Sequence, residues 1–149
     1  MKKKIPFYVF LLIIITWIFC VIPKNNFKKG EVFWDIGDKN VSLIVADTPE
    51  SQERGLGGRK TLPKDTAMYF VFDHPDKYGI WMKDMKFPID IIWLDKDHRI
   101  VSLERNVATS TYPKVFSPIS ESLYVLETKS GFSNENNLIV GKILNIIKN

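Results

Sequence analysis

Short stretches in which apolar residues fall on every second position run through the chain after residue 39, and they predict β-strands. The clearest example is Val41, Leu43 and Val45. Residues on alternate positions of a strand face the same side, so this period of two indicates strands with one buried face. Further short runs rich in β-branched and aromatic residues occupy residues 32–34, 68–72, 78–83, 89–94, 100–104, 123–127 and 143–147.

Many short strands at close spacing are typical of a sandwich or barrel, so we predict a mainly β fold. The specific expectation is a β-sandwich, jelly-roll-like or partly barrel-like, with one or two short helices. The clearest hairpin joins residues 89–94 to 99–104 through the polar turn at 95–98. Residues 106–120 contain two prolines and several hydroxyl side chains, and we expect a long ordered loop there.

One short helix is well marked after the strand at 41–45. Thr48 suits the N-cap, and Pro49 suits the first helical position because its missing N–H needs no partner there. The helix continues to Arg54, and Gly55 ends it because glycine adopts the left-handed geometry of a helix terminus. A second short helix is expected to begin at Ser133.

The N-terminal part of the chain predicts a membrane anchor. Residues Ile5 to Ile22 are eighteen positions without a charge, and a spanning helix needs about 20 apolar residues, with about 17 sufficient. The run ends in bulky residues, unlike the small residues before a signal-peptide cleavage site. We therefore predict a cytoplasmic tail at 1–4, a transmembrane helix at 5–22 in the lipid bilayer, a tether and first strand at 23–39, and a β-rich domain at 40–149.

Charge and cysteine content narrow the function classes. Lysines lie on both sides of the apolar run, but the very short tail favours a cytoplasmic N-terminus and an extracytoplasmic domain. From residue 23 onward there are 18 Lys or Arg against 17 Asp or Glu. Without a basic stripe, nucleic acid is not an expected partner. Cys20 is the only cysteine and the two histidines are 24 positions apart, so we expect no disulfide, metal or other cofactor.

Four ordered segments of the chain together resemble one protein family. They are Arg54-Gly55-Leu56 with Arg59, Trp81-Met82-Lys83-Asp84 with Pro88-Ile89-Asp90, Trp93-Leu94-Asp95 with Arg99-Ile100-Val101, and Tyr124-Val125-Leu126-Glu127 with Gly131. In this order, over about residues 40–147, they resemble the domain-of-unknown-function family 192. The resemblance implies a small, secreted or membrane-anchored, mainly β protein, and no established activity. Asp84-Met85 stands where that family often has Asn-Thr, and Gly141-Lys142 where it often has Gly-Asp.

Asp90 is the most distinctive carboxylate, because it opens the otherwise apolar strand at 89–94. A carboxylate among aliphatic residues is costly unless it is paired or hydrogen-bonded. Two interpretations stay open. Asp90 is either a general base or ligand-binding acid, or it is held by backbone N–H groups or an arginine to fix the turn after Pro88.

Trp81 and Lys83 share one face of their strand and can form an aromatic platform beside a cation, suited to a sugar, an anion or a peptide. Equally, Trp81 can be a core residue with the Lys83 stem packed past it. Arg54 and Arg59 flank the glycines after the helix. They predict either an anion site or, more conventionally, an ion-pair clamp from the helix to Asp90 or Glu127.

The leading functional hypothesis is a ligand-binding or accessory module of the cell envelope, because no catalytic set is recognisable. Its ligand would be a saccharide, a peptide or a small anion held by Trp81, Lys83, Asp90, Arg54 and Arg59. The rival is a hydrolase that acts on envelope polymers through carboxylates, for which Asp84, Asp90 and Glu127 are the candidates. A third hypothesis is a structural partner in a membrane complex, which an exposed apolar patch would favour.

Overall fold

The computed structural model describes residues 32–36 and 39–148 of the chain. The predicted tail, anchor and most of the tether lie outside this range. Within it, no helix is long and apolar enough to cross a bilayer. The elements are β1 (Val32–Ile36), β2 (Lys39–Ala46), α2 (Pro49–Arg54), β3 (Thr66–Asp76), β4 (Ile80–Trp81), β5 (Ile89–Leu94), β6 (Ile100–Val107), a 3-10 turn η1 (Thr109–Thr111), β7 (Val115–Phe116), β8 (Ser122–Lys129), α3 (Phe132–Glu135) and β9 (Asn145–Lys148).

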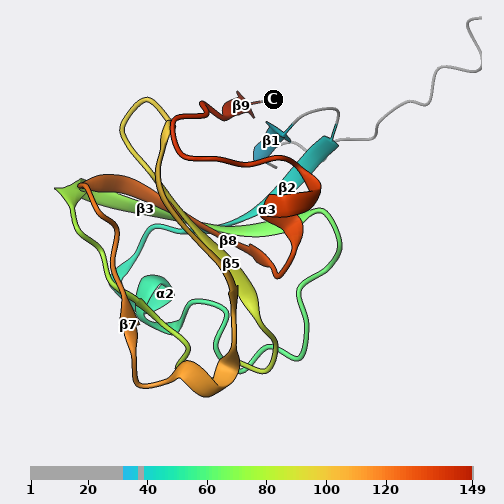
Figure 1. Ribbon diagram of the computed structural model, residues 1–149, viewed down its shortest axis with the longest axis vertical. Coiled ribbons are helices and arrows are strands. Elements are labelled where there is room, and N and C mark those ends of the chain that lie inside the picture. Colours follow the sequence, from blue (N-terminus) through green and yellow to red (C-terminus); the bar gives the residue numbers. More distant parts are fainter. Residues whose placement is uncertain (1–31, 37–38, 149) are drawn as a thin grey trace, which may run out of the picture.

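Seven strands form one mixed sheet in the order β6-β5-β8-β3-β2-β1-β9, and β4 pairs with β7 in a separate two-stranded sheet. The β2–β3 pair is parallel, and the other pairs of the large sheet are antiparallel. Parallel neighbours need a crossover connection rather than a hairpin, and here α2 lies within that connection. The helix is thereby held beside the sheet that it helps to cover (Figure 1).

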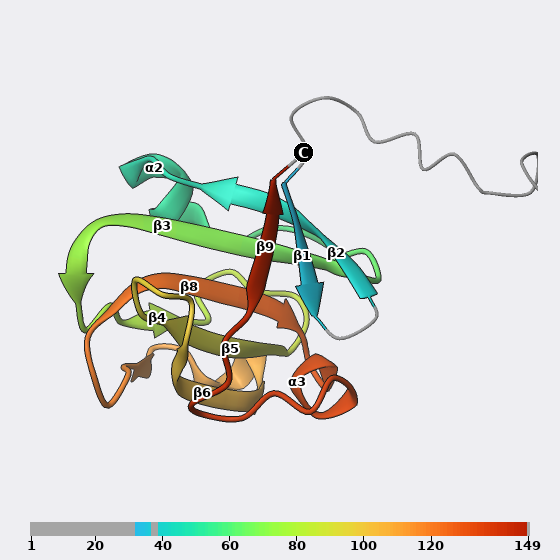
Figure 2. The ribbon, with the colours of Figure 1, turned by 90° about the horizontal axis from the view of Figure 1, so that it is seen from above.

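Both faces of the large sheet are buried at β5, each under its own apolar cluster. On β5, Ile91 and Trp93 face one cluster, whereas Ile92 and Leu94 face the other. Successive strand residues point to opposite faces, so the two clusters together bury every residue of β5. Figure 1 shows α2 and β7 on one side of the sheet and α3 on the other, and Figure 2 shows the sheet curling between them.

The local elements expected from sequence are largely confirmed. Thr48 caps α2, Pro49 begins it and Gly55 ends it with a positive φ of 50°. The β5–β6 hairpin pairs Leu94 with Ile100, and α3 begins one residue before the expected position. A mainly β fold with two short helices is therefore established.

The sheet arrangement differs from the predicted sandwich of two sheets. Within the described residues, one large sheet curls without closing into a barrel, and the short β4–β7 pair forms the only other sheet. Residues 78–83 give a strand of just two residues, and the expected loop at 106–120 contains both η1 and β7. Such short strands exist through their tertiary pairing, which the alternation of residues along a chain does not encode.

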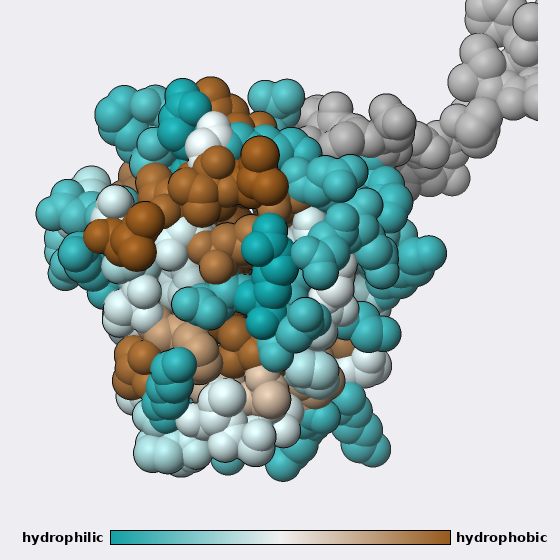
Figure 3. Space-filling model, viewed as in Figure 1, coloured by the Kyte–Doolittle hydropathy of each residue, from teal (hydrophilic) through white to brown (hydrophobic). Residues whose placement is uncertain are grey.

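The segment between α3 and β9 returns across the end of the β5–β6 hairpin. The amide of Ile100 donates to the carbonyl of Lys142 at 2.8 Å, and the amide of Leu144 donates to the carbonyl of His98 at 3.0 Å. This leaves Ile139, Val140 and Ile143 about half exposed or more, at 62%, 56% and 47%. Figure 3 shows apolar surface gathered over this part of the molecule. It is a surface separate from the pocket described next.

Candidate functional site

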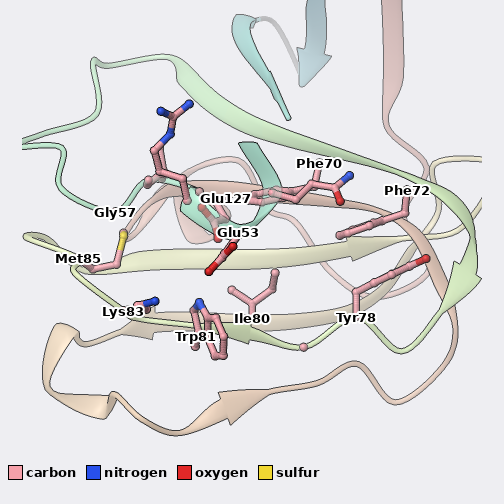
Figure 4. Close-up of a pocket in the computed structure, with 15 residues that line it drawn as sticks. Glu53, Gly57, Phe70, Phe72, Tyr78, Ile80, Trp81, Lys83, Met85 and Glu127 are labelled. Atoms are coloured by element: carbon pink, nitrogen blue, oxygen red, sulfur yellow. The ribbon is translucent and has the colours of Figure 1, made fainter. Parts of the chain in front are cut away.

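A pocket of about 280 Å³ opens between α2, the large sheet and the segment around β4. Its walls come from four places: residues 52–57, Phe70 and Phe72 of β3, residues 78–81 with Lys83 and Met85, and Glu127 of β8. Figure 4 shows Phe70 and Glu127 along one side and Ile80, Trp81 and Lys83 along the other. The pocket thus combines aromatic walls with a few ionisable side chains, which is the usual composition of a small-molecule site.

Local chemistry fixes α2 over the sheet. Thr48 and Ser51 form a reciprocal capping box at the N-terminus of the helix. At the other end, the side-chain amide of Gln52 donates to the carbonyl oxygen of Val71 at 2.7 Å. A Cβ atom on Gly55 would lie 3.5 Å from the Phe70 ring and 3.8 Å from Oε2 of Glu127. The end of α2 therefore lies directly beside the only described glutamate in the sheet interior.

The opposite wall is the segment 78–85, anchored to the core at one point and stacked at another. The indole N–H of Trp93 donates to the carbonyl of Tyr78 at 2.8 Å. The rings of Tyr78 and Phe72 stack with centroids 3.5 Å apart. Trp81 is 44% exposed, and the ammonium of Lys83 lies 5.8 Å from the centroid of its ring. The indole is consequently a surface of the pocket, and its face already accepts a cation.

Direct backbone contact joins the two walls at the mouth of the pocket. The amide of Gly58 donates to the carbonyl of Asp84 at 3.0 Å. A Cβ atom on Gly57 would lie 2.9 Å from the carbonyl oxygen of Arg54 and 3.2 Å from that of Lys83. Only glycine allows this approach. Asp84 adopts a φ of 58°, a conformation that Asp and Asn tolerate better than most residues.

Glu127 is the most unusual group of the pocket. Its side chain is 4% exposed, and its Oε2 atom is buried without a hydrogen-bond partner. Burial raises the pKa of the Glu127 carboxyl from 4.5 to about 8, because desolvation disfavours the charged form. At neutral pH the group is mainly a neutral acid that can donate one hydrogen bond and accept others.

The structure separates the residues that the sequence grouped into one site. Arg54, Trp81, Lys83 and Glu127 all line the pocket. Asp84 lines an adjoining groove of about 480 Å³ that shares Arg54 and Lys83 with the pocket. Arg59 and Asp90 line neither space. Asp90 therefore does not share a pocket with Trp81, Lys83 and Arg54, its fellow candidates for ligand binding.

Asp90 lies on the opposite face of the sheet, is fully buried, and has a structural role. Its carboxylate accepts backbone hydrogen bonds from Asn106 at 2.8 Å, Gly131 at 3.3 Å and Ser133 at 2.8 Å. These donors come from the end of β6 and the start of α3. Asp90 therefore holds these two segments together, as the backbone-donor interpretation anticipated, although its partners are not the turn after Pro88.

The predicted arginine clamp is wrong. Throughout residues 39–145, whose side chains the structure describes, the one salt bridge joins Lys96 to Asp97 at 2.9 Å. Arg54 is exposed and lines the mouth of the pocket instead of reaching Asp90 or Glu127. Asp90 takes its charge compensation from backbone amides, and burial keeps Glu127 largely neutral, so neither carboxyl needs an arginine partner.

Several lining residues escaped the sequence interpretation, chiefly Glu53, Phe70, Phe72 and Tyr78. Glu53 resembles an ordinary solvent-facing helix residue, but α2 places it over the pocket beside Arg54. Phe70 and Phe72 lie two residues apart on β3, so they share a face. That spacing was visible in the sequence, but it did not show which face would border a pocket. Across the described part of the chain, no group of three or more His, Cys, Asp or Glu is placed to hold a metal ion.

Comparison with known proteins supports the fold. Residues 32–146 match the model of DUF192, described as an uncharacterized ACR. No curated protein matches the chain with significance. A crystal structure from Sinorhizobium meliloti 1021, named a candidate transcription regulator, has a TM-score of 0.70 at 22% identity and covers 77% of this chain and 91% of its own. A protein of unknown function from Novosphingobium aromaticivorans DSM 12444 has a TM-score of 0.69 at 24% identity, covering 85% and 90%. At these identities the likeness concerns the fold alone.

Proposed function

We propose that this chain, which belongs to the DUF192 family, binds a small molecule in the pocket between α2 and residues 78–85. The observation that carries the proposal is Glu127, whose Oε2 atom is buried at the pocket without a partner. A buried polar atom left unpaired costs about 1–3 kcal/mol, and native proteins keep few of them. A ligand that pairs with this oxygen would recover that cost on binding.

The remaining walls fit the same role. Phe70, Phe72 and Trp81 provide apolar and aromatic contact area, and Arg54 and Lys83 supply charge at the mouth. The indole of Trp81 is 44% exposed and belongs to neither core cluster. Aromatic side chains with one free face are common in binding sites. The uncharged run at 5–22 supports a placement at the membrane, with the pocket presented outside the cytoplasm. The module would then serve the cell envelope.

Ligand-observed NMR with the full-length chain and a library of small fragments tests this proposal. Fragments that bind the wild type should lose their signal with Trp81→Ala, Lys83→Ala and Glu127→Gln. They should keep it with the matched exposed controls Ile119→Ala and Glu121→Gln, which lie outside the pocket. Melting temperatures of Trp81→Ala and Lys83→Ala should stay near the wild-type value. The proposal fails if no fragment binds, or if the pocket variants and controls behave alike.

A second candidate function is acid–base hydrolysis, because the pocket contains two carboxyl groups in different environments. The raised pKa keeps Glu127 protonated at neutral pH, whereas Glu53 is exposed on α2. Such a pair supplies a proton donor and a proton acceptor, as in many glycosidases. Chromogenic aryl glycosides would reveal turnover, and both Glu53→Gln and Glu127→Gln should abolish it. Turnover that survives Glu53→Gln would remove this candidate while leaving simple binding intact.

A further inference from the structure

We infer that the ligand is a small zwitterion, with a protonated amine seated against Glu127 and a carboxylate held at the mouth by Arg54 and Lys83. The inference rests on the proposed binding function and names the chemical class that the same pocket would take. It follows from where the polar groups lie along the pocket: acceptor oxygens lie at the floor, and two cations face one carboxylate at the mouth.

The floor offers two hydrogen-bond acceptor oxygens and no cation. Oε2 of Glu127 lies 3.8 Å from the Cβ position of Gly55, and the carbonyl oxygen of Gln52 lies 4.0 Å from that same position. Carbonyls at a helix C-terminus carry partial negative charge and favour cations. An ammonium group donates up to three hydrogen bonds, so it can pair with both oxygens, whereas an anion could use only the single proton of the neutral Glu127 acid.

Aromatic rings border the same floor. The Cζ atom at the edge of the Phe70 ring lies 3.5 Å from the Cβ position of Gly55, which is also 3.8 Å from Oε2 of Glu127. Cations are attracted to aromatic faces, and indole is the strongest of the three common rings. Lys83 already occupies such a position, 5.8 Å from the Trp81 ring centroid. The walls therefore suit an ammonium group as well as the apolar body of a ligand.

The mouth has an excess of positive charge, because Arg54 and Lys83 line it against a single carboxylate, Glu53. Arg54 and Lys83 are exposed there, and neither forms a salt bridge within the described side chains. Guanidinium binds a carboxylate through two parallel hydrogen bonds. A ligand with a cation alone would pass these two positive groups without compensation. A ligand with a carboxylate as well would pair with them.

The size of the pocket limits the ligand further. Ligand pockets mostly measure about 300–1,000 Å³, and this one, at about 280 Å³, is at the lower limit. Gly57 and Gly58 join the two walls by backbone contact, so the pocket cannot widen without breaking them. The class that fits is a single amino acid or a compound of similar size, rather than a long peptide or an oligosaccharide.

Binding of the amine should release a proton. Glu127 has a pKa of about 8 in the empty protein and is mainly protonated at pH 7. Contact with an ammonium group favours the carboxylate, so the proton passes to the buffer while the amine keeps its own. The ionisable groups around the pocket are Glu53 and Arg54 from α2 and Tyr78 and Lys83 from the opposite wall. The strand neighbours of Glu127 are Met68 and Ile91, which do not titrate.

Isothermal titration calorimetry with four phenyl probes tests the inference. The probes are phenylalanine, phenethylamine, 3-phenylpropionate and phenethyl alcohol, which share a ring but differ in charge. Phenylalanine should bind at least about tenfold more tightly than the others, since it alone carries both an ammonium group and a carboxylate. Titrations in buffers of different ionisation enthalpy at pH 7 should show close to one proton released, as a group with a pKa near 8 becomes ionised. Glu127→Gln should weaken phenylalanine about tenfold or more and abolish proton release, whereas Glu121→Gln should change neither.

Variants at the mouth give an independent readout. Arg54→Gln should weaken phenylalanine and leave phenethylamine unchanged or slightly tighter. The inference is overturned if phenethyl alcohol binds as well as phenylalanine, if Glu127→Gln leaves phenylalanine affinity unchanged, or if no probe binds at millimolar concentration. In those cases the fragment screen still decides the proposed function, since uncharged fragments that depend on Trp81 and Glu127 would sustain it with another ligand class.

Discussion

Glu127 should make the stability of the domain depend on pH in a way that one substitution removes. The folded protein holds the pKa of this carboxyl at about 8, against 4.5 in the unfolded chain. Folding therefore favours the protonated form. The stabilisation is fully present below pH 4.5 and is lost progressively as the pH rises to about 8. Glu127→Gln keeps the shape of the protonated acid and cannot ionise.

The size of this effect follows from the two pKa values. A tenfold change in proton affinity corresponds to about 1.4 kcal/mol, so the wild type should lose up to about 5 kcal/mol relative to Glu127→Gln between pH 4.5 and pH 8. Local opening that lets water reach the carboxylate would reduce this figure. A substantial part of the stability of a small domain, about 5–15 kcal/mol in total, thus depends on the protonation of one side chain.

Urea unfolding of the full-length chain, followed by tryptophan fluorescence from pH 5 to pH 8.5, measures the effect. The difference in unfolding free energy between Glu127→Gln and the wild type should grow with pH, in favour of the variant. Other titrating groups are common to both proteins and cancel in the difference. Glu121→Gln, an exposed control, should follow the wild type. A difference that stays constant with pH would show that Glu127 is ionised in the folded protein and would refute the reasoning.

Three further predictions concern the framework of the pocket. Asp90→Ala should lower the unfolding free energy by about 3 kcal/mol or more in urea unfolding, because three backbone donors lose a charged acceptor. The exposed control Asp97→Ala should lower it by less than about 1 kcal/mol, and equal losses would contradict the role given to Asp90. Gly57→Ala should cost about 1–3 kcal/mol in the same assay, since the new methyl group meets two carbonyl oxygens, and an unchanged midpoint would show that the walls move apart freely. Thr48→Ala should cost about 1 kcal/mol through the lost cap of α2, and a loss below about 0.3 kcal/mol would mean that Gln52 and the turn hold the helix unaided.

Features set by neighbouring residues were predictable from the sequence. Thr48, Pro49 and Gly55 mark the two ends of α2 through short-range chemistry, and the β5–β6 hairpin follows from two strands beside a polar turn. Alternation located most strands for the same reason. Each of these signals acts within a few positions along the chain, where sequence spacing and spatial distance are closely related.

Features set by strand register were not predictable. Asp90 pairs with Thr128, and Glu127 pairs with Ile91. Since paired residues share a face and successive residues alternate, this register puts the two carboxyl groups on opposite faces of the sheet. The sequence offered both as members of one site. A shift of one position would have brought them to the same face, and nothing in either strand distinguishes the two registers because β5 is buried on both sides.

The pocket itself depends on long-range placement. Phe70 and Glu127 meet because β3 pairs with β8, whereas Lys83 comes from the segment after β4. The parallel β2–β3 crossover then places α2 over them. Trp81, Lys83 and Glu127 were nevertheless identified as candidates because they lie at the ends of predicted strands, and Arg54 because it flanks the glycines after the helix. Glu53 was not, because a glutamate in a short polar helix has many ordinary explanations.

The contact of Gly57 and Gly58 with residues 83–84 has a kinetic consequence. Because the two walls are joined by backbone contacts at the mouth, they cannot open and close relative to each other. A ligand therefore enters a pocket that already has its final shape. Association should then be a single-step process whose observed rate rises linearly with concentration, without the plateau that a slow rearrangement would impose. Such a rigid site selects ligands by steric exclusion of larger molecules, and bound ligand exchanges rapidly with free ligand in solution.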